Sequence, residues 1–147
     1  MGRKKLVVSD PVYDDNESIE SKLTKLFSPE HIICNFTESK YEEYKKALMH
    51  RNIQLALHDR ALMQTVAAFF NNDLNTSVTS DKTFMHRNTL NYRLEKLKRY
   101  TGLDLKRFDH AVLFKNLIVV YRKLFSKIDS PVAIHRKRKP REEDALD

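Results

Sequence analysis

Apolar side chains recur along most of the chain at intervals of three, four or seven residues, the spacing of one face of an α-helix. Ile19, Leu23, Leu26 and Phe27 follow this spacing until Pro29, and lie between polar and charged residues. Proline ends most helices because it lacks the N–H that the next turn requires. The pattern therefore predicts a short amphipathic helix before Pro29.

From residue 37 a stretch without glycine or proline predicts one long helix. Ser39 and Glu42 have the spacing of a helix-capping box at its start. Five large apolar residues in this stretch fall at strict intervals of seven, and we call them the heptad seam: Tyr41, Leu48, Leu55, Leu62 and Phe69. Such a repeat is typical of helices that pair along one stripe, and equally of a helix that packs into its own core. The helix is also a candidate for a break near His58 and Asp59.

The second half of the chain is divided by a polar loop at residues 71–75 and by Gly102, which stands where a left-handed helix cap requires glycine. Between these two points the pattern predicts three elements: a short polar segment over 77–83, a tight connector over 84–86 and a helix over 87–100. A strongly apolar helix over 109–125 follows, and we expect it to be largely buried.

The composition favours an all-α fold without a catalytic or metal site. Two glycines and four prolines are too few for the turns of a β-sandwich or for glycine-rich phosphate loops. Cys34 is the single cysteine and the six histidines lack metal-ligand spacing, so we expect no metal and no cofactor. No apolar run reaches membrane-spanning length, and the first residues lack the features of a signal peptide. We therefore expect a cytoplasmic protein with no evident small-molecule ligand.

Positive charge is concentrated in the second half of the chain. The sequence carries a formal net charge of +7. Residues 60–125 hold 12 Lys and Arg against 5 Asp and Glu, which accounts for the whole excess. A basic stretch of this kind indicates a polyanionic partner, and double-stranded DNA is the first candidate.

The polar segment, the connector and the helix over 87–100 have the layout of a helix-turn-helix, whose second helix enters the major groove. Leu90, Leu94 and Leu97 share one side of that helix, and the polar residues lie on the other. Residues near its start are expected to contact bases: Arg87, Asn88, Thr89, Asn91 and Tyr92. Basic residues around it are expected to contact phosphates: Lys82, His86, Arg93, Lys96, Lys98 and Arg99. The alternative is a merely solvated basic face, which the presence of Glu95 favours.

Two motifs connect this layout to a known family. The run His86-Arg87-Asn88-Thr89-Leu90-Asn91-Tyr92-Arg93-Leu94, followed by Thr101-Gly102-Leu103-Asp104-Leu105, resembles the C-terminal helix-turn-helix of the PucR/CdaR class of bacterial transcription regulators. The likeness covers residues 60–125, and the layout is similar to that of Fis-type domains, which are dimeric and bend DNA. The resemblance implies a groove-facing set of five residues: His86, Arg87, Thr89, Asn91 and Tyr92. The chain length and the leucine repeat are also similar to those of a small leucine-rich protein of streptococci.

Three features depart from the family pattern. Ser80, Lys82 and Thr83 stand where the first helix of the motif usually has small apolar residues, which predicts looser packing of that helix. Asn91 stands where the family usually has arginine, which bears on base preference and on binding itself. Residues 1–59 are too short for the sensory region that members commonly carry upstream, so no effector response is expected.

Together these features predict an all-α protein whose N-terminal helices, within residues 1–59, form a leucine-rich dimer interface. A helix-turn-helix domain over 60–125 and a basic, then acidic, disordered tail over 126–147 follow. The predicted function is sequence-dependent binding of double-stranded DNA by a homodimeric bacterial transcription regulator, without catalysis. The alternative is a helical dimeric interaction protein with a degenerate helix-turn-helix that no longer binds DNA. Single-stranded RNA is a weaker candidate partner, because clustered exposed aromatic residues for base stacking are lacking.

Overall fold

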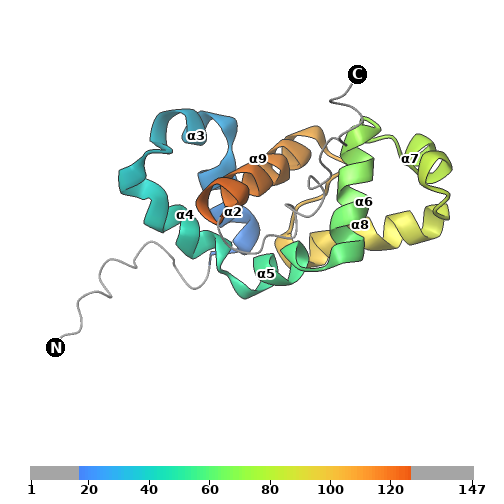
Figure 1. Cartoon of the computed structure of the whole chain (residues 1–147), viewed down its shortest axis with the longest axis horizontal. Helices are drawn as coiled ribbons and strands as arrows, with labels where there is room; N and C mark the ends of the chain where they lie inside the picture. Colours follow the sequence, from blue (N-terminus) through green and yellow to red (C-terminus); the bar gives the residue numbers. More distant parts are fainter. Residues whose placement is uncertain (1–16, 127–147) are drawn as a thin grey trace, which may run out of the picture.

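The computed structural model describes residues 17–126, which fold into helices without a strand (Figure 1). The elements are α2 (Ile19–Phe27), α3 (Pro29–Asn35), the 3-10 helix η3 (Glu38–Lys40), α4 (Tyr41–Leu48), α5 (Arg51–Leu57), α6 (Arg60–Asn71), α7 (Thr76–Thr83), α8 (Arg87–Thr101) and α9 (Phe108–Leu124). The all-α class is therefore confirmed. The tail predicted over 126–147 lies outside the described residues except for Ser126.

Side chains cap most of these helices. Six residues at helix starts accept a hydrogen bond from a backbone N–H of the first turn: Ser18, Ser28, His50, Asp59, Asn75 and His86. Those N–H groups have no partner within the helix, so the caps stabilise their helices, by about 0.5 to 2 kcal/mol each for the serine, aspartate and asparagine caps. At the other end of α8, Gly102 adopts the expected left-handed conformation, with φ of 82°. The capping box expected at Ser39 is wrong, because Ser39 lies within η3 and makes no cap.

The long helix predicted after residue 37 is also wrong, because the chain turns twice and forms α4, α5 and α6 in its place. The second turn falls at His58 and Asp59, where a break was expected. The first falls at Met49 and His50, where the His50 ring accepts a hydrogen bond from the Asn52 N–H at 3.1 Å. These caps satisfy the N–H groups that a break exposes, so each short helix can turn its own apolar side toward one core.

The five residues of the heptad seam do not lie together on one exposed surface of the molecule. Leu48, Leu62 and Phe69 are buried in the chain's own core, while Leu55 is 41% exposed and Tyr41 is half-buried. The expectation that these five residues pair two copies is therefore wrong for the three buried ones. The turns between α4, α5 and α6 bring the helices together, so the chain covers its own apolar stripe.

One hydrophobic core extends across the boundary expected at residue 59. α5 and α6 pack against α8, and α2 and α4 pack against α9, which runs through the middle of the molecule (Figure 1). The expected apolar helix is confirmed in α9, where Phe114, Leu117 and Tyr121 are buried. The helices before and after residue 59 thus share a single core, whereas the division of the chain into domains stays a prediction.

Candidate nucleic-acid interface

α7, the turn over 84–86 and α8 form a helix-turn-helix at one end of the molecule. α7 packs against α6 and against α8, and this end lies away from α2, α3 and α4 (Figure 1). α8 is held from behind by α5 and α6. One side of α8 is therefore fixed by the core, and the other side is free to meet a partner.

Backbone and hydroxyl hydrogen bonds close the turn between the two helices. Phe84 takes the left-handed conformation, with φ of 57°, and its N–H donates to the carbonyl oxygen of Ser80. The Ser80 hydroxyl in turn donates to the carbonyl oxygen of Met85, and the Thr83 hydroxyl donates to that of Thr79 at 2.7 Å. The hydroxyls at Ser80 and Thr83 are thus satisfied locally. Thr79 is the one side chain of α7 that is fully buried, which agrees with loose packing of this helix.

α8 has one apolar and one polar face, as predicted. Leu90, Leu94 and Leu97 are buried against the neighbouring helices. The opposite face exposes Asn88, Tyr92, Glu95 and Arg99. The Arg99 guanidinium carbon lies 5.7 Å from the centre of the Tyr92 ring, within the range of a cation–π contact. The exposed face therefore carries hydrogen-bonding, aromatic and cationic groups in a single line.

The five residues predicted to contact bases differ in accessibility. Arg87, Asn88 and Tyr92 are exposed, whereas Thr89 and Asn91 are partly buried. The Oδ1 atom of Asn91 is buried and has no hydrogen-bond partner within the described part of the chain. Three of the five are thus presented openly, and two lie at the edges of the exposed face.

Ser77 also belongs to this site, although no sequence pattern predicted it. The Nη2 atom of Arg87 donates to the Ser77 hydroxyl at 2.9 Å, which links the first turn of α8 to the first turn of α7. The two residues lie ten apart in sequence, so no helical period relates them. Only the packing of α7 on α8 brings them together.

Of the six predicted phosphate contacts, four are exposed and two are engaged within the molecule. The exposed ones are Lys82, His86, Lys98 and Arg99. Arg93 donates from Nη1 to the Thr65 hydroxyl at 3.1 Å, and Lys96 lies with Nζ 2.9 Å from Oδ2 of Asp59. Arg93 and Lys96 therefore tie α8 to α6 and to its cap.

The Asp59–Lys96 pair alters the protonation behaviour of both groups. Burial alone would raise the pKa of Asp59, but hydrogen bonds from the Lys96 ammonium and the Leu62 N–H outweigh it and lower that pKa below its ordinary value. The same hydrogen bond raises the pKa of Lys96. Both groups are therefore charged at neutral pH and hold each other in place.

Gly102, the residue that follows α8, lies close to α2. A Cβ atom at Gly102 would lie 2.6 Å from the Cβ of Glu20, closer than side chains approach. Just beyond, the Asp104 N–H donates to Nδ1 of the buried His110 at 2.9 Å. The C-terminal end of α8 is thus in contact with a helix from the first part of the chain.

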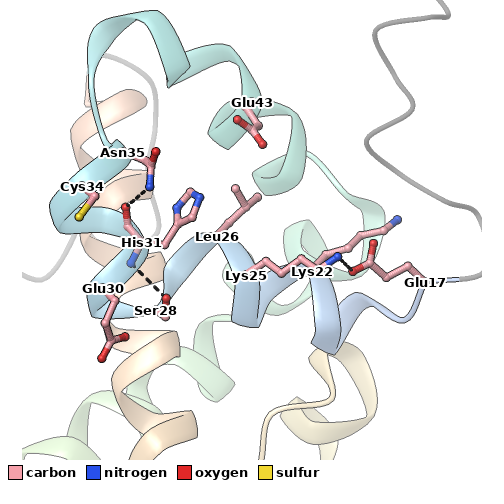
Figure 2. Close-up of a pocket in the computed structure, with 10 residues that line it drawn as sticks. All are labelled: Glu17, Lys22, Lys25, Leu26, Ser28, Glu30, His31, Cys34, Asn35 and Glu43. Atoms are coloured by element: carbon pink, nitrogen blue, oxygen red, sulfur yellow. Dashed lines mark hydrogen bonds and ion pairs between the residues drawn. The ribbon is translucent and has the colours of Figure 1, made fainter.

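A hollow of about 610 Å³ lies far from α8, among α2, α3 and α4. Figure 2 shows its lining, in which the Lys25 ammonium meets Glu17 at 2.8 Å and the remaining charges are of both signs. The lining contains the basic residue Lys22, but also the acidic residues Glu30 and Glu43. Because the charges are mixed, the hollow does not favour one class of ligand.

Residues 17–126 contain neither a metal-site cluster nor a membrane-spanning helix. No cluster of three or more His, Cys, Asp or Glu side chains in that range has the arrangement of a metal site. Among the helices of the described range, none has the length and hydropathy of a membrane span.

Comparison with known proteins gives a match over the same region. Residues 62–115 match the PucR C-terminal helix-turn-helix domain. The carbohydrate diacid regulator of Escherichia coli (strain K12) is 46% identical over 52 residues, which cover 35% of this chain and 14% of that protein. The proline-responsive transcriptional activator PutR of Bacillus subtilis (strain 168) is 28% identical over 99 residues, which cover 62% of this chain and 24% of that protein. The uncharacterized protein YxkF of the same organism is 30% identical over 76 residues, covering 52% of this chain and 26% of that protein.

The matched segments are thus a small part of these relatives, 26% of their length or less. No solved structure matches the chain significantly. The resemblance to the PucR class is confirmed, and the similarity to a streptococcal leucine-rich protein stays a prediction. Residues 62–115 of this chain are a helix-turn-helix domain of the PucR C-terminal type.

Proposed function

We propose that the chain is a sequence-dependent double-stranded DNA-binding protein that acts as a bacterial transcriptional regulator, with α8 in the major groove. The observation that carries this proposal is the exposed polar and cationic face of α8, on a helix-turn-helix of the PucR type. Two similar proteins are named as a regulator and as a transcriptional activator, which supports a regulatory role. The proposed role is binding in the cytoplasm, without catalysis.

Arg87, Asn88 and Tyr92 are the proposed base contacts at the centre of the interface, because their side chains are exposed. An arginine fork matches the O6 and N7 atoms of guanine, and an asparagine amide matches the edge of adenine. Thr89 and Asn91, which are partly buried, are proposed to contact bases at the margin. Base contacts of this kind provide discrimination of about 1 to 3 kcal/mol each.

Four exposed basic residues are proposed to contact phosphates and so to fix the register of α8: Lys82, His86, Lys98 and Arg99. Arg93 and Lys96 are proposed to do so only after leaving Thr65 and Asp59. Each phosphate that is neutralised releases bound counterions, so the number of such contacts is measurable from salt dependence.

We also propose that two copies bind together, as the similarity of the layout to dimeric Fis-type domains implies. Their two α8 helices would then enter major grooves at half-sites about 34 Å apart. Leu48, Leu62 and Phe69 are buried in the single chain, so the pairing surface of this dimer consists of other residues. Sedimentation equilibrium of the full chain, with and without duplex, tests this part of the proposal.

The test of the proposed function is a salt titration of DNA binding. Duplexes are first selected by the full chain from a randomised pool, and binding is followed by fluorescence anisotropy between 50 and 300 mM KCl. We expect a dissociation constant on the order of 10⁻⁸ M for selected duplexes and a log-log slope of roughly −0.9 per phosphate contacted. A folded chain that binds neither selected nor random duplexes at about 50 mM salt would contradict the proposal.

One observation favours a helical interaction protein as a second candidate function. Arg93 and Lys96 are held by groups of the chain itself, and Glu95 adds a negative charge to the exposed face. If α8 served a protein partner, selected and random duplexes would bind equally weakly. The same titration therefore separates the two functions.

A further inference from the structure

Phe84, in the turn between α7 and α8, combines two unfavourable features. Its side chain is 94% exposed, so the ring packs against almost nothing within residues 17–126. Its backbone has φ of 57°, in the left-handed region that bulky residues rarely adopt. Asp73 and Leu74 also have positive φ, but Leu74 packs against the core and Asp73 is polar. Within that range Phe84 alone is both strained and apolar in water.

Neither the turn nor the core requires a phenylalanine here. The turn uses only the backbone of Phe84, whose N–H donates to the carbonyl oxygen of Ser80. Glycine or asparagine adopts the left-handed conformation with less strain. An exposed ring gives up the free energy that burial of its apolar surface would supply. The ring therefore has no stabilising role within the fold, which leaves a contact with a partner.

The surroundings of Phe84 favour DNA as that partner. The turn lies directly before the first residue of α8, at the end of the molecule where α8 starts (Figure 1). Lys82, His86 and Arg87 are exposed on either side of it in the sequence. A recognition helix enters the groove with its N-terminal residues, so the turn before it lies at the groove edge. Apolar groups at that edge meet the C5-methyl of thymine and the faces of the deoxyribose rings.

We infer that the Phe84 ring is a DNA contact that packs on apolar groups of the duplex, either thymine methyls or deoxyribose. The inference rests on the proposed function, because it places α8 in the groove. It assigns to Phe84 a part of the binding affinity that is independent of salt, since an apolar contact displaces no counterion. The strained turn thus places an exposed aromatic ring beside α8.

The variant Phe84→Asn tests this inference, because asparagine tolerates positive φ and removes the ring. Affinity for the duplex selected by the unaltered chain is measured by anisotropy at several salt concentrations. We expect the affinity to fall about tenfold with an unchanged salt slope. The midpoint of thermal unfolding should stay equal to that of the unaltered chain or rise by a few degrees.

Ile33→Asn is the matched control. Ile33 is 82% exposed on α3, at the end of the molecule opposite α7, so its loss should leave DNA affinity unchanged (Figure 1). Replacing thymine by uracil in the duplex removes the methyl groups. If the methyls are the contact, this replacement weakens the unaltered chain about threefold to fourfold more than the Phe84→Asn variant. If deoxyribose is the contact, the replacement affects both proteins equally while the tenfold difference between them persists.

Three results would overturn the inference. Equal affinity of the variant and the unaltered chain would show that the ring does not contact DNA, and would favour a protein as its partner. The proposed function would not be affected. A fall of several degrees in the unfolding midpoint of Phe84→Asn would show that the ring serves the fold. Absence of DNA binding by the unaltered chain would overturn both the inference and the proposed function.

Discussion

The Nζ atom of Lys96 lies 2.9 Å from Oδ2 of Asp59, so a cation of α8 rests against the residue that caps α6. Asp59 uses its other oxygen to accept a hydrogen bond from the Leu62 N–H at 3.0 Å. One carboxylate thus serves as helix cap and as counterion. A phosphate that approaches Lys96 must compete with this carboxylate.

Asp59→Asn should therefore strengthen DNA binding at low salt. Asparagine is as good a helix cap as aspartate, but it carries no charge to hold Lys96. We expect a twofold to fivefold gain in affinity for random duplexes, with a log-log salt slope steeper by about 0.9 because one more cation meets phosphate. Anisotropy titrations measure both quantities. Asp59→Ala is the control, since it also removes the cap and should lower the free energy of unfolding by about 1 kcal/mol. An unchanged salt slope in Asp59→Asn would place Lys96 outside the interface.

The same carboxylate predicts a pH dependence of stability. The folded-state pKa of Asp59 is lowered, so its contribution is fully present above the unfolded-state value of about 3.9 and is lost as pH falls through the folded-state pKa. Urea unfolding of the unaltered chain and of Asp59→Asn is compared from pH 7 to pH 3. The difference in free energy of unfolding between them should stay constant down to about pH 5 and shrink below it. Other carboxylates titrate equally in both proteins, so a difference that grows toward acid would refute the assignment.

Gly102→Ala should destabilise the fold by about 2 to 4 kcal/mol, because it adds a left-handed alanine and a steric overlap. The overlap is with Glu20, whose Cβ lies 2.6 Å from the position of the new methyl group. Urea unfolding measures the loss. In the double variant with Glu20→Gly the overlap is relieved, so the combined loss should be smaller than the sum of the two single losses. Additive losses would mean that backbone strain alone accounts for the effect.

Arg87 and Lys98 should differ in what they contribute to DNA binding. Arg87 lies in the first turn of α8 and is assigned to a base, so Arg87→Ala should relax base preference at one position by about 1 to 3 kcal/mol. Lys98 is exposed near the other end of the helix and is assigned to a phosphate, so Lys98→Gln should weaken all duplexes alike and reduce the salt slope by about 0.9. Selection from a randomised pool, repeated with each variant, measures base preference. Identical selected sequences for the two variants would show that the assignment of Arg87 is wrong.

Local sequence signals predicted α2, α8 and α9, because each of these helices has an apolar repeat and a clear end. Pro29 follows α2, and Gly102 ends α8 with the expected left-handed cap. The turns within residues 37–71 were predicted only in part. A repeat of seven fits one long helix and several short ones equally well, and the cap at His50 uses a ring nitrogen, which is a less usual acceptor for that role.

The accessible side of α8 was predictable from periodicity. Which of its side chains form hydrogen bonds with other helices was not. Arg93 reaches Thr65, and Arg87 reaches Ser77, across 28 and 10 positions of sequence. Whether a cation on such a helix is free or engaged depends on how α6 and α7 pack against it. That packing is set by the whole core rather than by the spacing within one helix.

The common core of the early and late helices determines what a shortened version of this protein would be. Ile53 and Leu57 on α5 lie in the same buried cluster as Leu97 on α8, so removal of everything before residue 60 would expose leucines on the buried side of α8. Such a fragment would lose helices that pack against α8, and it would tend to self-associate in solution. Truncation is therefore a poor way to test the proposed DNA binding, and point substitutions on the intact chain are the cleaner probe.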